Sequence, residues 1–181
     1  MADVKLFDDG YAVVETNHVA AVRTGQIKAQ YEVAKDGSDF QNFENGMLLV
    51  VDDVAKDVDF PAIGTELCYL HASEERIYDP ILGRKSFILK GEFDRPKMYK
   101  LSEGDIFETN AVVVNDADFA DLAAAKAGAK YGVPHTSGRI ELLDETDGLA
   151  AFDTHAIVLE VVEFVTLPNE HEGIKFAVAQ A

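Results

Sequence analysis

The sequence predicts a mainly β fold, a small barrel or sandwich with one short helix and extended terminal arms. Short apolar and β-branched runs recur at spacings of roughly ten residues, each bounded by Gly, Pro, Asn or Asp. Some of these runs alternate with period two, as half-buried strands do. A single Ala-rich stretch has helical spacing and high helix propensity.

The first half of the chain is predicted to form strands only. Residues Gln26–Val33 alternate cleanly, with Ile27 and Tyr31 on the apolar side, which indicates one half-buried strand. We interpret residues 1–39 as an N-terminal arm or the first strands, and residues 40–181 as a barrel-like domain. Further short strands are expected at Met47–Val51, Glu66–Leu70, Ser86–Lys90 and Lys97–Leu101.

A turn and the predicted helix divide the second half. In Leu101–Asp105, Gly104 is expected to supply an unusual backbone angle and Asp105 to bond locally, before a strand over Ile106–Val114. The inserted helix is expected near residues 118–130, capped by Asp116 or Asp118.

Three strands are expected after the helix. Arg139–Leu143 resumes the β pattern. Ala156–Val165 is nearly all apolar and β-branched, which is typical of a central strand buried on both faces, apart from Glu160 and Glu163. Ile174–Val178 is predicted to be a last short strand or a clamped tail.

The charge is strongly acidic and unevenly distributed. The chain has 16 Lys and Arg against 33 Asp and Glu, a formal net charge of −17, and nine acids against two bases lie between Gly138 and Ala181. Such a charge argues against a nucleic-acid-coating role, because phosphate contacts need a net positive surface. No apolar run has the length of a membrane span. We therefore expect no direct nucleic-acid partner and no membrane.

One segment reverses the local charge. The basic strip, Arg84–Lys100, contains six of the 16 Lys and Arg residues and only two acids. A basic strip in an acidic chain indicates charge-matched contact with an acidic partner or a sister copy. The predicted interface residues are those of the strip and two from the N-terminal segment: Arg84, Lys85, Arg95, Lys97, Ile27 and Tyr31.

The sequence contains no complete set of catalytic or metal-binding residues. Cys68 lies in an apolar run and is interpreted as a buried small hydrophobe. Asp153 and His155 could place two metal ligands on one face of a strand, with a third from elsewhere, but such a pair is common by chance. Ser137 and His135 have no plausible orienting acid. We predict no catalytic residue, no cofactor and no metal.

Three stretches resemble a known class of protein. They are ENGMLLVV from Glu44, ELCYLHASEERIYDP from Glu66, and GRKSFILKGEFDRPKMYKLSEGDIFETNAVVV within Gly83–Asn115. Together they are similar to auxiliary structural proteins of tailed bacteriophages, over about Glu44–Asn115. The resemblance implies a head decoration, cement or other minor capsid protein, but no individual functional residue.

The leading hypothesis is therefore a non-catalytic structural protein of a phage virion, made in the host cytoplasm and located in the capsid. It would stabilise the capsid lattice by binding across subunit boundaries, with the major capsid protein or other head proteins as partners, and as a homo-oligomer. Two alternatives stay open: an acidic DNA mimic that inhibits a host nucleic-acid enzyme, and a barrel that binds a small molecule or sugar.

Overall fold

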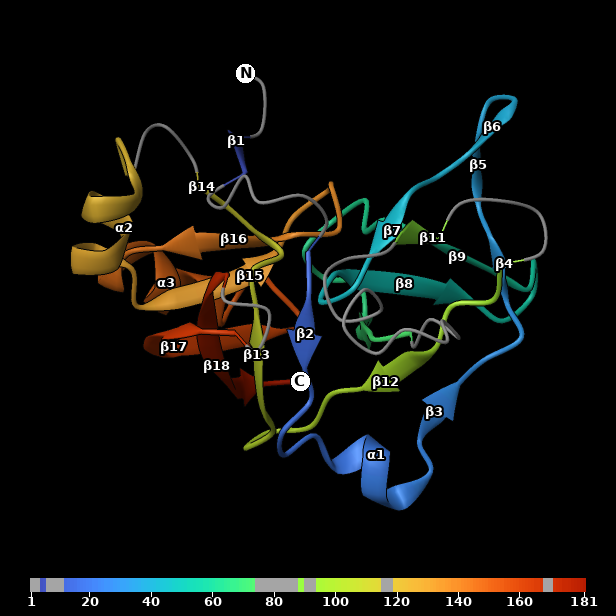
Figure 1. Ribbon diagram of the computed structural model, residues 1–181, viewed down its shortest axis with the longest axis horizontal. Helices are drawn as coiled ribbons and strands as arrows, with labels where there is room; N and C mark the ends of the chain where they lie inside the picture. Colours follow the sequence, from blue (N-terminus) through green and yellow to red (C-terminus); the bar gives the residue numbers. More distant parts are fainter. Residues whose placement is uncertain (1–3, 6–11, 74–87, 90–93, 115–118, 168–170) are drawn as a thin grey trace.

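The protein is mainly β, as predicted, with a sandwich-like arrangement of several sheets and three short helices among the described residues. The computed structural model describes residues 4–5, 12–73, 88–89, 94–114, 119–167 and 171–181. Figure 1 shows the larger sheet on the left and the smaller sheet on the right.

The larger sheet, here sheet A, has eight strands. In spatial order they are β1 (Val4–Lys5), β14 (Val112–Val114), β16 (Ile140–Leu143), β15 (Tyr131–Pro134), β17 (Val158–Thr166), β18 (Glu172–Gln180), β13 (Ile106–Thr109) and β2 (Val14–Glu15). All neighbours are antiparallel except β14 and β16, which are parallel.

The connection between β13 and β14 makes sheet A curl. These strands lie next to opposite ends of the sheet, yet only Asn110 and Ala111 join them. Such a link spans at most about 11 Å, so the two margins of the sheet must approach each other. In the described part of the chain the barrel is not closed, because β1 and β2, at the two ends of the strand order, do not pair with each other.

The smaller sheet, here sheet B, has six strands and is accompanied by two two-stranded sheets. Its order is β3 (Ile27–Lys28), β12 (Met98–Lys100), β10 (Cys68–His71), β8 (Leu48–Asp52), β9 (Asp57–Asp59) and β4 (Glu32–Val33). One two-stranded sheet is the hairpin of β5 (Lys35–Asp36) and β6 (Asp39–Phe40), and the other pairs β7 (Phe43–Glu44) with β11 (Ile88–Leu89), which is distant in sequence.

The strands of sheet B are apolar on both faces because both faces are buried. Leu48, Cys68 and Leu70 pack with sheet A in one core, which also contains Phe107 and Phe176. The alternate residues face a second core, made of Leu49, Tyr69, Met98, Phe43 and Val58. Sheet B is therefore the middle layer of the molecule.

The structure has two helices more than the sequence predicted. The expected helix is α2 (Leu122–Gly128), and its cap is Asp121, whose carboxylate accepts a bond from Ala124 N; Asp116 and Asp118 lie outside the described residues. The additional helices are α1 (Ala20–Thr24) and α3 (Glu145–Ala151). Both have fewer than eight residues, so they leave little periodicity in the sequence.

Two strand predictions differ from the structure. Gln26–Val33 is not one strand, because Gln30 has φ 72° and separates β3 from β4. The strand over 156–165 is not buried on both faces. Val158 and Leu159 are buried, but Val162 is 51% exposed, because α3 packs only against the beginning of β17.

The C-terminal residues are part of the sheet. β18 has nine residues and lies between β17 and β13, where it pairs on both sides instead of forming an extended arm. In the same way, β1 and β2 of the N-terminal segment pair with β14 and β13. The turn before β13 has the predicted chemistry, since Gly104 has φ 86° and Asp105 accepts a bond from Ser102 N.

Candidate functional site

The structure describes four of the six predicted interface residues. Arg84 and Lys85 lie outside the described residues. Arg95 forms an ion pair with Glu32 at 3.1 Å, whereas Lys97 is half-buried and its backbone N donates to Ser73 Oγ. Ile27 and Tyr31 are close together in sequence, and Tyr31 belongs to the set of charged and aromatic residues described next.

Five residues of sheet B and its loops form the lysine–tyrosine cluster: Lys28, Tyr31, Asp53, Lys56 and Tyr69. Asp53 is its centre, because one carboxylate oxygen binds Lys28 Nζ at 2.5 Å and the other accepts a hydrogen bond from Tyr31 OH at 2.5 Å. Lys28 Nζ lies 5.3 Å from the ring centroid of Tyr69, and Lys56 Nζ lies 5.7 Å from that of Tyr31. These are cation–π distances.

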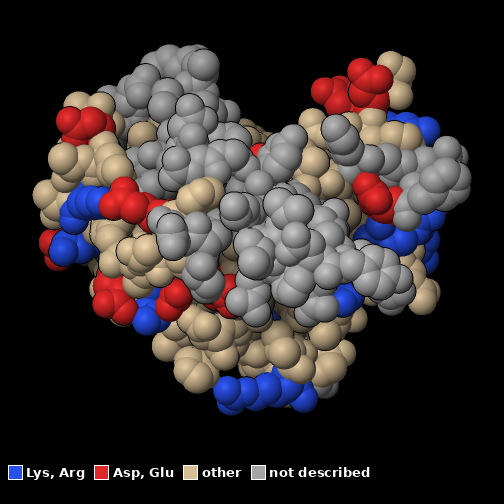
Figure 2. Space-filling view, in the orientation of Figure 1, with Lys and Arg blue, Asp and Glu red and all other residues tan. Residues whose placement is uncertain are grey.

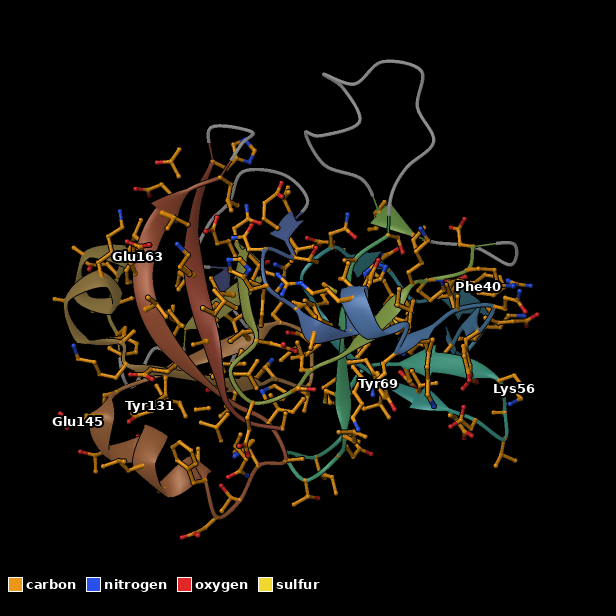
Figure 3. The ribbon with its side chains drawn as sticks, turned by 90° about the horizontal axis from the view of Figure 1, so that it is seen from below. Phe40, Lys56, Tyr69, Tyr131, Glu145 and Glu163 are labelled. Carbon is orange, nitrogen blue, oxygen red and sulfur yellow. The ribbon has the colours of Figure 1, made fainter. Side chains whose placement is uncertain are left out.

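The elements of sheet B bring the cluster together from distant parts of the sequence. Lys28 is on β3, Tyr69 is on β10, and Asp53 and Lys56 lie in the hairpin between β8 and β9. Figure 3 shows Lys56 and Tyr69 in the same lobe as Phe40, at the opposite end of the molecule from Glu145. A similar contact occurs beside it, where Lys35 Nζ lies 4.6 Å from the ring centroid of Phe40.

Electrostatics keep the cluster charged at neutral pH. The bond from Lys28, followed by the bond from Tyr31, holds the pKa of Asp53 below its ordinary value. The same carboxylate raises the pKa of Lys28 and of Tyr31 above their ordinary values. Lys28 is therefore an ammonium, Asp53 a carboxylate and Tyr31 a neutral phenol that donates its proton.

The backbone at the cluster adopts an uncommon conformation. The described residues include two non-glycine positions with positive φ, Gln30 at 72° and Lys56 at 64°, and both are within or adjacent to the cluster. A bond from Glu32 N to Lys56 O, 2.9 Å long, connects these two loops. Such conformations cost free energy and are concentrated at functional sites.

The hairpin tip beside the cluster exposes an apolar side chain. Asp52 Oδ1 accepts bonds from Val54 N and Ala55 N, so the turn is ordered. Val54 at the apex is 93% exposed. An exposed apolar side chain on an ordered turn is a surface that a protein partner can bury.

The charge around the cluster is mixed. Asp57 on β9 has a raised pKa, chiefly because of burial and secondarily because of the Asp52 and Asp59 carboxylates. Figure 2 shows blue and red side chains next to each other along the right side of the molecule, over the region of β4 to β6. The surface therefore combines aromatic rings with both signs of charge.

A second polar group is buried between the sheets. Arg139 donates to Glu44 Oε1 at 2.6 Å, and the two side chains are only 7% and 8% exposed. The other carboxylate oxygen, Glu44 Oε2, accepts a bond from Ala12 N at 2.7 Å. This buried junction connects the N-terminal segment, β7 and the start of β16.

His71 extends the buried junction as a neutral ring. Its Nδ1 is 2.8 Å from the carbonyl oxygen of Glu44, which can only accept, so Nδ1 carries the proton. Its Nε2 then accepts from Ser73 Oγ at 2.9 Å, and Ser73 Oγ accepts in turn from Lys97 N. Burial lowers the pKa of His71 to about 4.

Cys68 is a buried hydrophobic residue, as predicted. It is fully buried in the core between the sheets, and burial raises the pKa of its thiol to about 12. A thiol with that pKa stays protonated at neutral pH and is a poor nucleophile.

The candidate metal pair is not on a strand. Asp153 and His155 lie in the turn after α3, because β17 begins only at Val158. The ring of His155 packs on Gly64, where a Cβ atom would collide with it, and Ala156 N donates to Gly64 O. In the described part of the chain, no group of three or more His, Cys, Asp or Glu residues is placed to hold a metal ion.

His135 and Ser137 form a local turn. Nδ1 of His135 is 2.9 Å from Ser137 Oγ and also accepts from Ser137 N. The contact joins residues two apart in sequence, which is the usual geometry of a side chain that stabilises its own turn.

Comparison with known protein families, curated proteins and solved structures finds no match to this chain. Among the described helices, none is long and apolar enough to cross a membrane.

Sequence reasoning found part of the cluster and missed its centre. Tyr31 was predicted as an interface residue, but Asp53, Lys56 and Tyr69 were not. The available signal was the stretch Asp52–Asp57 between two apolar runs, which is a hairpin pattern. That pattern locates a turn, whereas the contact of its Asp53 with Lys28 depends on the strand order of sheet B.

Proposed function

We propose that this chain is a non-catalytic structural protein of a phage virion that binds the capsid lattice across subunit boundaries. The observation that carries the proposal is the lysine–tyrosine cluster with the exposed Val54 beside it. This surface contacts a shell protein. The virion setting comes from the sequence resemblance over Glu44–Asn115, which includes Asp53, Val54, Lys56 and Tyr69.

The cluster supports attachment because it is ordered before a partner arrives. Lys28, Tyr31 and Asp53 hold one another in place, so little side-chain entropy is lost on binding. Aromatic rings at the centre and charges around them are the common composition of a binding hot spot. Repetition over many equivalent positions of a shell multiplies a modest contact.

The mixed charge favours a protein partner over nucleic acid. The cations Lys28 and Lys56 lie among the acids Glu32, Asp52 and Asp57, so a phosphate backbone would meet repulsion as well as attraction. The DNA-mimic alternative has less support. Lys175 lies between Glu108 and Glu163, at 3.3 and 2.8 Å, and interrupts the row of carboxylates that a mimic would need.

The first test locates the chain. Virions purified from infected host cells are analysed by quantitative mass spectrometry, with the non-particle fraction of the lysate as the comparison. We expect the chain in the particles at a constant ratio to the major capsid protein. Recovery only in the non-particle fraction would overturn the virion assignment.

The second test addresses the surface. Purified chain is added to shells made without it, and occupancy is measured for wild type, Val54→Asp and Leu149→Asp. Both replaced residues are exposed apolar residues and both changes add one negative charge. We expect Val54→Asp to reduce occupancy at least tenfold and Leu149→Asp, on α3, to leave it unchanged. Equal loss in both variants would show that net charge, and not the hairpin tip, governs attachment.

A further inference from the structure

The edge of sheet B at β3 is basic. Arg23 is in the last turn of α1, Lys28 is on β3, and Lys100 is on the neighbouring strand β12. Within the described residues neither Arg23 nor Lys100 is ion-paired. Two exposed apolar residues accompany them, Val22 at 48% and Ile27 at 39%. We call Val22, Arg23, Ile27, Lys28 and Lys100 the β3 edge.

The outer face of sheet A is acidic. Glu163, Lys175, Glu108 and Glu15 are paired in register across β17, β18, β13 and β2, and they share one face. Glu160 lies on the same face, opposite Ala177, and is exposed. Four carboxylates share this face with one lysine, and the exposed Val162 is next to Glu163 in sequence. We call Glu15, Glu108, Glu160, Val162, Glu163 and Lys175 the acidic face.

The acidic face contains a pairing of like charges that does not stabilise the fold. Glu108 is directly opposite Glu15 in the β13–β2 register, and like charges across a strand pair are unfavourable. Lys175 forms ion pairs with Glu108 and Glu163. An uncompensated excess of negative charge on an ordered sheet face matches a cationic partner surface.

We infer that the β3 edge of one copy binds the acidic face of a second copy of this chain. The charges are complementary, since the edge has three cations beside one bonded acid, Asp53, and the face has four acids beside one cation. Each surface also includes exposed apolar side chains, Val22 and Ile27 on one and Val162 on the other. The inference concerns self-association, whereas the proposed function concerns attachment to a shell. Lys28 belongs to both surfaces, but Arg23 and Lys100 belong to the β3 edge alone.

Salt should affect this contact in two opposite ways. Each copy has a net charge of −17, so whole molecules repel each other at long range. The Debye length is about 30 Å at 0.01 M salt and about 10 Å at 0.1 M, so moderate salt removes this repulsion while direct contacts survive. Much higher salt weakens the contacts as well. Self-association is therefore strongest at intermediate salt, near 0.1–0.2 M.

The experiment uses sedimentation equilibrium of the full chain at about 0.15 M NaCl, with two complementary variants. Arg23→Glu/Lys100→Glu changes the β3 edge, and Glu160→Lys/Glu163→Lys changes the acidic face. Lys126→Glu/Lys130→Glu is the control for charge. Each Lys or Arg to Glu replacement changes the net charge by −2, so the edge variant and the control both go from −17 to −21.

We expect wild type and control to associate with dissociation constants within about threefold of each other. Each of the two test variants alone should associate at least tenfold more weakly, and an equal mixture of the two should associate again through reversed charges. The acidic-face variant has a smaller net charge of −13, so bulk repulsion alone would make it associate more strongly. A monomeric wild type at about 0.5 mM, or a mixture that stays monomeric, would overturn the inference.

These outcomes are separable from those of the proposed function. Val54→Asp should leave self-association unchanged, because the hairpin tip belongs to neither surface. A chain that associates in solution without binding shells would support this inference and contradict the proposed function.

Discussion

Two ion pairs with the same chemistry lie in contrasting parts of the molecule. Arg139 and Glu44 are 2.6 Å apart between the sheets, with side chains 7% and 8% exposed. Lys28 and Asp53 are 2.5 Å apart at the rim of sheet B, with side chains 27% and 59% exposed. The first pair is shielded from solvent, whereas the second is partly exposed to it.

The two ion pairs are suited to different roles, one in folding and the other in recognition. Removing the partner of a buried charge costs much free energy of folding, because the remaining charge is out of contact with water and no longer paired. Glu44 also accepts from Ala12 N, so the junction holds three segments together. An exposed pair costs little to rearrange, and its charges stay available to a partner. The buried pair therefore organises the fold, while the rim pair is suited to binding.

The largest loss of stability is expected from removing one partner of the buried Arg139–Glu44 pair. Arg139→Met leaves the Glu44 carboxylate buried without its cation, which should lower the free energy of unfolding by about 3–5 kcal/mol. Urea denaturation followed by far-UV circular dichroism measures this. The double variant Glu44→Gln/Arg139→Met, which removes both charges, should be more stable than Arg139→Met alone. A double variant less stable than the single one would contradict this account of the junction.

The second-largest expected effect is a loss of stability at low pH, caused by His71. The pKa of His71 is about 4 in the folded protein and ordinarily 6.5, so the unfolded chain takes up the proton first. Stability is full above pH 6.5 and decreases as the pH falls from 6.5 to 4, by about 3 kcal/mol at 1.36 kcal/mol per unit. Urea denaturation at a series of pH values measures the slope.

A variant of His71 separates its contribution to the pH dependence of stability from the contribution of the carboxylates. His71→Gln keeps a donor for Glu44 O and an acceptor for Ser73 but cannot take up a proton in this range. The difference in unfolding free energy between wild type and variant should shrink or change sign as the pH falls to 4. A difference that does not depend on pH would contradict the neutral, buried state of His71.

The sequence predicted the strands well where a local pattern decides the structure. β8, β10, β12 and β16 lie within one or two residues of the predicted runs, because alternation and flanking turn residues are local signals. The exposed half of β17 could not be predicted. Its apolar sequence resembles a fully buried strand, and only the position of α3 decides how much of it is covered.

The sites depend on contacts between residues distant in sequence. Glu44 and Arg139 are 95 residues apart, and Lys28 and Asp53 are 25 apart. Neither pair has a sequence signature, because their meeting depends on the pairing order of the strands. The basic strip stays a prediction. Arg95 pairs with Glu32 and Lys97 is half-buried, but Arg84 and Lys85 lie outside the described residues.

Two glycine substitutions compare a buried position with an exposed one, and their expected costs in unfolding free energy are intermediate. Gly46 beside the buried junction and Gly25 at the end of α1 have similar φ values, 86° and 74°. A Cβ on Gly46 would collide with Thr109, whereas a Cβ on Gly25 meets nothing within 4 Å. We expect Gly25→Ala to cost about 1 kcal/mol from strain alone. Gly46→Ala should cost about 2–3 kcal/mol, because overpacking is added. Equal costs in urea denaturation would mean that Thr109 moves aside.

The smallest effect on stability, and the largest on binding, is expected at the rim pair. Lys28→Met and Asp53→Asn each remove one charge from a solvated pair, and the exposed side chains regain water. Neither variant should shift the urea midpoint beyond experimental error at 0.1 or 1 M NaCl. Attachment to shells should nevertheless weaken in both, because the ion pair that holds Lys28 against Asp53 is lost and more of the cluster must then be ordered on binding. A midpoint shift comparable to that of Arg139→Met would show that the Lys28–Asp53 pair stabilises the fold. The assignment of the buried pair to folding and of the exposed pair to binding would then be wrong.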